Sequence, residues 1–268
     1  MKKVLIYTSI IILTIIVVGL IVVKTSIVRV ELPHGAILHV LPAPKDNHPH
    51  GAIVLCPGGG YTHLEKWKEG YRWFPFIYSH GYAVAMLEYR MPAHHHTVPL
   101  TDGAEAIQVM REYAKEWGFD KKHVGVMGFS AGGHLASTLM VSDNASVRPD
   151  FGILFYPVIS MKKELTHKGS HDCLLGENAS EQLENRYSNE LHVSGQTPPA
   201  YIAVSIDDQN VNPQNAICFH DAMLAQKRPG TLHVYPSGGH GWKLRYLFLH
   251  QEQILDDLSA WLKEKIKE

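Results

Sequence analysis

The alternation of short apolar runs with helical periodicities constrains the fold of this chain more than any other feature. Apolar runs of strand length recur along it, at residues 27–32, 36–41, 52–56, 82–87, 123–128, 152–158, 201–205 and 232–235. Helices are expected at 100–117, where apolar residues recur at three- and four-residue steps, and at 130–141, and a closing helix with an apolar stripe is expected at 254–262. This alternation predicts an α/β fold, in which a mostly parallel central sheet carries helices on both faces.

Three details of this pattern are specific enough to be checked. The first two runs are separated by Pro33-His34-Gly35, which predicts a turn and an antiparallel pair. The predicted helix over 100–117 takes its apolar side from Ala106, Ile107, Met110, Tyr113, Ala114 and Trp117. The polar stretch 160–197 is too long for a plain connection, and the sequence leaves open whether it forms a lid over a site or a surface loop with a short helix.

Size and charge bound the class of protein. The chain has 268 residues, of which residues 25–268 suit one large α/β domain. Its 25 Lys and Arg balance 26 Asp and Glu, so there is no electrostatic case for a nucleic-acid partner. The three cysteines are too few and too scattered for a disulfide framework, and Cys56 ends an apolar run typical of the core. Oligomeric state has no signature in this sequence.

Residues 1–24 form a separate segment. Lys2 and Lys3 precede 20 uncharged, mostly aliphatic residues, Val4 to Val23. A helix of that length matches a hydrocarbon core of roughly 30 Å. No Ala-x-Ala-like cleavage site ends the run, and no cysteine follows it closely. We therefore expect an uncleaved anchor that tethers an exported, periplasmic domain to the inner membrane; the alternative is secretion after signal cleavage.

The 18 histidines include the triplet His94-His95-His96. A metal site is one interpretation, but no carboxylate or cysteine stands immediately beside the triplet, so a polar loop is favoured. We expect no metal and no organic cofactor.

Gly128-Phe129-Ser130-Ala131-Gly132 is the motif that points to chemistry. It begins where the apolar run 124–127 ends, and it opens a helical segment. A serine on a tight strand-to-helix turn has strained backbone angles and an exposed hydroxyl, and the flanking glycines allow close approach of neighbouring chain. This context predicts that Ser130 is a nucleophile.

A nucleophilic serine requires a base and a carboxylate that orients the base, in the chain order Ser, acid, His on this kind of fold. His240, in Ser237-Gly238-Gly239-His240-Gly241-Trp242, follows the last predicted strand and is the candidate base. Asp207 and Asp208 follow the preceding strand, and the residues alone do not choose between them. Asp208 or Asp207 would accept a hydrogen bond from His240 and stabilise the imidazolium.

An oxyanion site requires amide donors beside the nucleophile. One donor is expected to be Ala131, the residue after the serine. The second is expected from Pro57-Gly58-Gly59-Gly60-Tyr61, which follows the run 52–56, and we assign it to Gly59 and Gly60. Tyr61, Trp67 and Trp73 are candidate side chains for a sugar subsite, although aromatic side chains are more often core residues.

From residue 28 to the C-terminus, the chain resembles the bacterial acetylesterase branch of the α/β-hydrolases, which includes acetyl-xylan-esterase-like and feruloyl-esterase-like enzymes. The resemblance is carried by four motifs: Pro57-Gly58-Gly59-Gly60-Tyr61, Glu88-Tyr89-Arg90-Met91-Pro92, Gly128-Phe129-Ser130-Ala131-Gly132-Gly133-His134-Leu135 and Gly238-Gly239-His240-Gly241-Trp242. The segments 166–171 and 174–176 also look like this branch.

The resemblance implies an α/β-hydrolase fold and a Ser130–His240–Asp208 triad. Asp208 is preferred because the acid of this branch commonly precedes a valine by three positions and an asparagine by seven, here Val211 and Asn215. The implied activity is hydrolysis of acetyl esters on carbohydrate or xylan fragments through an acyl-enzyme. Alternatives that keep the triad are a membrane-tethered lipid esterase or a peptidase; a non-catalytic anchored binding protein is a third class.

Overall fold

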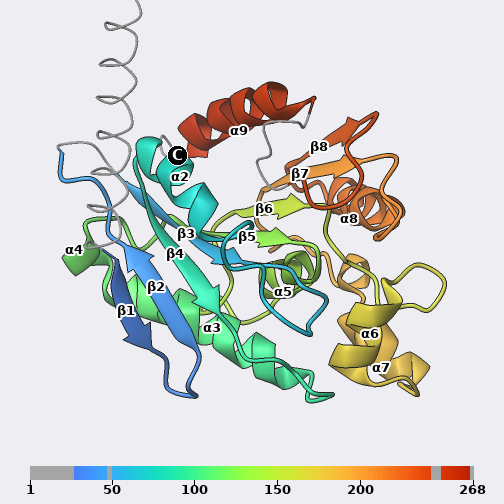
Figure 1. The fold of residues 1–268 in the computed structure, drawn as a ribbon. Coiled ribbons are helices and arrows are strands. Elements are labelled where there is room, and N and C mark those ends of the chain that lie inside the picture. Colours follow the sequence, from blue (N-terminus) through green and yellow to red (C-terminus); the bar gives the residue numbers. More distant parts are fainter. Residues whose placement is uncertain (1–26, 47–49, 243–248, 266–268) are drawn as a thin grey trace, which may run out of the picture.

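The computed structural model describes residues 27–46, 50–242 and 249–265, which contain an eight-stranded sheet (Figure 1). Its strands, in the spatial order β1-β2-β4-β3-β5-β6-β7-β8, are Val28–Glu31 (β1), Ile37–Leu41 (β2), Tyr82–Glu88 (β4), Gly51–Cys56 (β3), Val124–Phe129 (β5), Gly152–Phe155 (β6), Ala200–Ser205 (β7) and Gly230–Tyr235 (β8). β2 is antiparallel to β1 and β4, and all other neighbours are parallel. The predicted mostly parallel sheet with an antiparallel opening pair is confirmed.

Helices cover both faces of this sheet. Those described are Phe74–Ser79 (α2), Thr97–Glu112 (α3), Ala114–Trp117 (α4), Ala131–Met140 (α5), Lys168–Leu175 (α6), Glu181–Tyr187 (α7), Gln214–Ala225 (α8) and Gln251–Lys265 (α9), with 3-10 turns at Tyr71–Trp73 and Asn189–Leu191. α2 and α9 lie side by side on one face, whereas α3, α5 and α8 lie on the other (Figure 1). The pair α2 and α9 is tied by a hydrogen bond between His80 Nε2 and Ser259 Oγ at 2.9 Å.

The hydrophobic core lies on both faces of the sheet, because helices cover both faces. Every residue of β3, β5 and β7 is buried, because strands covered on both faces must be apolar on both. Cys56 at the end of β3 lies in this core, as expected, and burial raises its pKa to about 12. The predicted stripe of α9 is buried as well, and each of its side chains contributes roughly 1.5–3 kcal/mol by leaving water; its members are Ile254, Leu258, Trp261 and Leu262.

Two predicted elements end differently in the structure. The helix expected over 100–117 is broken at Tyr113, which caps both α3 and α4. Tyr113 is 38% exposed and stacks on Trp117 at a ring-centroid distance of 5.0 Å, so it does not belong to the buried side of the helix. β6 stops at Phe155 rather than at residue 158, because Tyr156 has φ 36° and Pro157 has no amide hydrogen for the ladder.

The polar stretch 160–197 contains α6, α7 and the second 3-10 turn, so it is a helical excursion rather than a loop with one helix. α6 and α7 lie together beside the sheet (Figure 1). The anchor predicted for residues 1–24 lies outside the described residues. Among the helices of the described ranges, none is both long and apolar enough to cross a membrane.

Candidate active site

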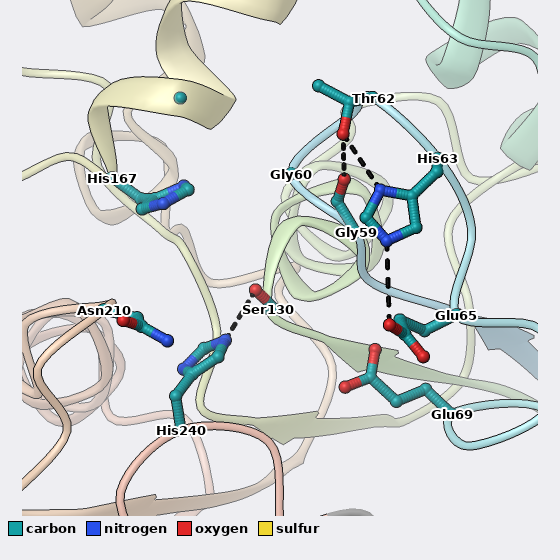
Figure 2. Close-up of a pocket in the computed structure, with 11 residues that line it drawn as sticks. Gly59, Gly60, Thr62, His63, Glu65, Glu69, Ser130, His167, Asn210 and His240 are labelled. Atoms are coloured by element: carbon teal, nitrogen blue, oxygen red, sulfur yellow. Dashed lines mark hydrogen bonds and ion pairs between the residues drawn. The ribbon is translucent and has the colours of Figure 1, made fainter.

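Four loops that follow parallel strands meet at the carboxyl edge of the sheet. The glycine loop 57–60 follows β3, Ser130 follows β5, Asp208 follows β7 and His240 follows β8. In a parallel sheet the carboxyl ends of neighbouring strands share one edge, so residues far apart in sequence become neighbours there. Figure 2 shows Ser130 and His240 facing each other in this pocket.

Ser130 occupies a strained turn between β5 and α5. Its backbone angles are φ 52° and ψ −122°, which are costly for a residue with a side chain. A Cβ on Gly132 would lie 2.0 Å from the carbonyl oxygen of Cys56, and one on Gly128 would lie 2.4 Å from the carbonyl oxygen of Gly132. Glycine is therefore required on both sides. The turn has the form of a nucleophile elbow, with the serine at the N-terminus of a helix.

His240 lies between Ser130 and Asp208. Its Nε2 is 2.9 Å from Ser130 Oγ, and its Nδ1 is 2.7 Å from Asp208 Oδ2. The Asp208 carboxylate can only accept, so the ring proton resides on Nδ1 and the Nε2 lone pair faces the serine hydroxyl. The structure thus brings together the three side chains that the sequence selected.

The two adjacent aspartates have different partners. Asp208 is buried, and its second oxygen accepts from the amides of Asn210 at 2.9 Å and Val211 at 3.0 Å. Asp207 is exposed and accepts from the amides of Gly238 at 3.2 Å and Gly239 at 2.8 Å. Asp208 therefore contacts the imidazole itself, whereas Asp207 binds the loop that carries it.

The glycine loop lies against the nucleophile turn. Gly59 and Gly60 have φ values of 128° and 64°, which glycine adopts without strain. The amide of Gly58 donates to Glu69 Oε2 at 2.8 Å. In the described part of the chain, the amides of Gly59, Gly60 and Ala131 donate to no protein acceptor, so they remain available to a ligand.

Glu69 links the glycine loop to the far side of the site. Its side chain is buried, and its Oε1 accepts from the hydroxyl of Tyr156 at 3.2 Å. The ring of Tyr156 in turn meets the imidazole of His240 edge-on, at a centroid distance of 4.9 Å. Glu69 therefore binds the glycine loop directly and supports the imidazole of His240 through Tyr156.

A cavity of about 330 Å³ opens above Ser130. Its wall includes three histidines and two carboxylates beside apolar surface. Its lining residues are Gly59, Gly60, Thr62, His63, Glu65, Glu69, Ser130, His167, Gly169, Asn210 and His240.

The three aromatic residues proposed for a sugar subsite are not among these lining residues. Tyr61 is 2% exposed and its hydroxyl contacts His134 Nδ1 at 2.9 Å. Trp73 is 4% exposed and stacks on Phe155 at a centroid distance of 5.2 Å. Buried rings cannot stack on a sugar, which corrects the expectation for these two. Trp67 is exposed but lies against Tyr71 outside the pocket.

Sequence reasoning missed Glu69, His167 and Asn210 as site residues. They come from three connections, after β3, within the excursion 160–197 and after β7, whose ends meet only in the folded chain. Only His167 stood in a segment that carried the family resemblance, and no local pattern gave it a role.

His134, in the first turn of α5, connects the site to the segment 160–197. Its Nε2 lies 2.8 Å from the carbonyl oxygen of Tyr187, which can only accept. The proton is therefore on Nε2, and Nδ1 accepts from the hydroxyl of Tyr61. Burial lowers the pKa of His134 to about 4, so the ring is neutral at pH 7. The neutral ring joins the nucleophile helix, the glycine loop and α7.

The histidine triplet also contacts the excursion. The ring of His94 bonds the carbonyl of Asp172 at 2.9 Å, and the ring of His96 meets the Tyr187 hydroxyl at 2.6 Å. These contacts favour the interpretation of the triplet as a polar loop. Within residues 27–46, 50–242 and 249–265, no three His, Cys, Asp or Glu side chains are grouped so as to hold a metal ion.

Comparison with known proteins finds two curated relatives named as xylan-related enzymes. The chain is 40% identical over 216 residues to an acetylxylan esterase of Xylanibacter ruminicola, which covers 79% of this chain and 45% of the relative. It is 33% identical over 212 residues to an endo-1,4-beta-xylanase B of Butyrivibrio fibrisolvens, covering 74% and 33%. The chain thus spans less than half the length of these curated relatives.

Among solved structures, an acetyl ester-xyloside bifunctional hydrolase from Caldicellulosiruptor lactoaceticus superimposes with a TM-score of 0.78. It is 33% identical, over 85% of this chain and 88% of that one. Together these relatives confirm the predicted α/β-hydrolase fold. Residues 38–223 match the family described as BD-FAE. The chain therefore belongs to the BD-FAE family, in the acetylxylan-esterase-like branch of the α/β-hydrolases.

Proposed function

We propose that this chain is a serine esterase that removes short acyl groups, above all acetyl, from carbohydrate fragments of the xylan type. The observation that carries the proposal is the hydrogen-bonded series Ser130–His240–Asp208, with spans of 2.9 and 2.7 Å. The cavity above Ser130, with polar side chains such as His167 and Asn210 in its wall, suits a short acyl group on a hydroxylated alcohol. The names of the relatives, an acetylxylan esterase and an acetyl ester-xyloside hydrolase, support the same substrate class.

In the acylation half of the reaction, Ser130 Oγ attacks the ester carbonyl carbon while His240 Nε2 takes the hydroxyl proton. The carbonyl oxygen becomes an oxyanion, for which the amides of Ala131 and of Gly59 or Gly60 are the donors. The bond to the alcohol oxygen then breaks, and His240 returns the proton to that oxygen. Asp208 stabilises the imidazolium that exists between these two transfers.

In the deacylation half, water attacks the acyl-Ser130 carbonyl and gives its proton to His240. The second tetrahedral intermediate uses the same amides. Its collapse breaks the bond to Ser130 Oγ, which regains the proton from His240, and the carboxylic acid leaves. The acyl group is thus transferred to water and the enzyme is restored.

The direct test is Ser130→Ala with p-nitrophenyl acetate, because the variant removes only the hydroxyl oxygen. We expect turnover to fall by at least about 10³-fold while the circular dichroism spectrum is unchanged. Unchanged turnover would exclude Ser130 as the nucleophile. Failure of a fluorophosphonate probe to label the folded wild type would favour a non-catalytic scaffold.

Acyl-chain length separates the proposed esterase from a lipid hydrolase with the same triad. Acetyl esters should be cleaved with a far higher kcat/KM than octanoyl esters, since the cavity of about 330 Å³ must also admit the alcohol. Preference for octanoate would favour the lipid alternative. A series of acetylated xylo-oligosaccharides then tests the substrate class itself.

We also propose that residues 1–24 anchor the domain 25–268 to the inner membrane on its periplasmic side. The support is the uncharged run Val4–Val23 behind Lys2 and Lys3. Membrane fractionation of the full chain, beside a form that starts at residue 25, tests this proposal. Recovery of the full chain in the soluble periplasmic fraction at reduced mass would favour cleavage instead.

A further inference from the structure

His167 contributes a polar group to the pocket that the triad chemistry does not use. It precedes α6, where its side chain caps the helix by accepting from the amide of Ser170. A Cβ on Gly60 would lie 3.9 Å from His167 Cε1, so the ring lies over the glycine loop. Figure 2 shows the imidazole directed into the pocket, across from Thr62 and His63.

The hydrogen bonds of the ring decide where its proton is. Nδ1 accepts from the Ser170 amide at 3.2 Å, and an amide can only donate; the Ser170 hydroxyl lies 2.9 Å from the same nitrogen. The proton of the neutral ring is therefore on Nε2. In the described part of the chain, no hydrogen bond joins Nε2 to a protein atom, and His167 lines the cavity. The ring therefore offers the pocket one N–H donor.

The neutral form is also the one that its surroundings favour. Burial lowers the pKa of His167, the nearby His240 lowers it further, and Asp208 opposes both. His167 and His240 line the same pocket (Figure 2). An imidazole beside the catalytic base is thus held uncharged and oriented.

Asn210 completes this side of the pocket. Its amide nitrogen in the main chain binds Asp208 Oδ1, which fixes its position, and its side chain lines the cavity. In Figure 2, Asn210 and His167 lie on the same side as His240, whereas Thr62, His63 and Glu65 lie on the opposite side. Two neutral hydrogen-bonding side chains therefore flank the imidazole.

The mechanism assigns this side of the pocket to the alcohol half of the ester. His240 must protonate the departing alcohol oxygen, so that oxygen lies within hydrogen-bond reach of Nε2. Side chains that flank His240 consequently face the alcohol, whereas the main-chain amides of Gly59 and Gly60 face the carbonyl oxygen. We infer that His167 and Asn210 form a subsite for a hydroxyl group of the alcohol, adjacent to the ester bond. This subsite rests on the proposed esterase function and would select esters of polyhydroxylated alcohols.

Two substrates that differ by one hydroxyl test the subsite: ethyl acetate and 2-hydroxyethyl acetate, followed by titration of released acetic acid. The wild type should prefer 2-hydroxyethyl acetate in kcat/KM by about three- to tenfold, the range for one neutral hydrogen bond. His167→Asn keeps an oxygen near Nδ1 to cap α6 but is too short to offer the Nε2 donor. Its ratio of kcat/KM for 2-hydroxyethyl acetate to kcat/KM for ethyl acetate should fall to about one, because only the first ester uses the Nε2 donor.

His167→Gln is the rescue variant, since its terminal amide nitrogen reaches the position of Nε2; it should retain most of the preference. His192→Asn, an exposed substitution in the same excursion and outside the pocket, should leave the preference at the wild-type ratio. Equal losses on both substrates in His167→Asn, or no loss of preference, would overturn the subsite. A wild type that hydrolyses both esters equally would overturn it while leaving the esterase proposal intact. A wild type that hydrolyses neither would overturn both.

Discussion

The carboxylate of Asp207 accepts a hydrogen bond from the amide of Gly239 at 2.8 Å, one residue before His240. Its neighbour Asp208 contacts the imidazole of that histidine at 2.7 Å. Two consecutive acids at the end of β7 thus act on one histidine in different ways. Asp208 holds the ring by a hydrogen bond to Nδ1, whereas Asp207 binds the main chain that carries it.

This division predicts unequal effects of two matched substitutions. Asp208→Asn removes the buried charge beside Nδ1 and permits the wrong tautomer, so kcat for p-nitrophenyl acetate should fall by about 10³- to 10⁴-fold. Asp207→Asn keeps an oxygen acceptor for Gly238 or Gly239 on an exposed side chain, so kcat should fall by about tenfold at most. Steady-state kinetics of both variants at one pH measure the ratio. Equal losses would contradict the assignment.

Glu69 predicts a second effect on turnover. Glu69→Gln keeps the size of the side chain but provides one acceptor oxygen where Gly58 and Tyr156 now use two. Loosening of the glycine loop should act on the transition state more than on substrate binding. We expect kcat for p-nitrophenyl acetate to fall about tenfold with KM changed less than twofold, a loss of about 1.4 kcal/mol. A rise in KM at constant kcat would instead show that Glu69 serves substrate binding.

The order of elements and the meeting of Ser130 and His240 with an acid that follows β7 were predictable from sequence for one physical reason. Buried parallel strands are apolar on both faces, so their limits are marked in the sequence, and whatever follows them collects at one edge. The choice of Asp208 over Asp207 came instead from the family resemblance. The helices on both faces of the sheet also explain why Tyr61 and Trp73 were wrongly expected in a sugar subsite. Because both faces of the sheet are covered, an aromatic side chain near the site packs in the core as readily as it faces the pocket.

Glu69, His167 and Asn210 were not predictable by this reasoning. Each lies in a connection whose path depends on packing between distant segments, such as the contact of His134 with Tyr187 that attaches α7 to α5. Tyr113 fails differently, since its spacing suits the helix stripe but the helix breaks there. Periodicity describes a regular helix and contains no signal for where the chain departs from it.

The packing of the nucleophile turn predicts a large effect on stability. A methyl group on Gly132 would stand 2.0 Å from the Cys56 carbonyl oxygen and 2.4 Å from that of Pro57, both main-chain atoms. Gly132→Ala should therefore lower the free energy of unfolding by about 3 kcal/mol or prevent folding. Gly195→Ala is the control, because no heavy atom lies within 4 Å of its added Cβ. It should change stability by less than about 0.5 kcal/mol in urea unfolding, and equal effects of the two would contradict the packing argument.

Burial of His134 predicts a pH dependence of stability. Its folded-state pKa is about 4, against 6.5 for the free side chain. Below pH 6.5 the unfolded chain binds a proton that the folded protein does not, so stability falls as pH decreases from about 6.5 to 4 and levels off below. At pH 5 this loss amounts to about 2 kcal/mol relative to pH 7.

Other histidines titrate in the same range, so the measurement requires a variant that isolates His134. His134→Gln keeps a nitrogen donor for the Tyr187 carbonyl but does not titrate, and we expect it to be less stable than wild type at pH 7. Urea unfolding of both proteins at pH 7 and pH 5 gives two differences in free energy. The wild-type advantage should shrink by about 2 kcal/mol between them, because only the wild type loses stability through this ring. An advantage that is the same at both pH values would mean that His134 takes up its proton in the folded state as easily as in the unfolded chain.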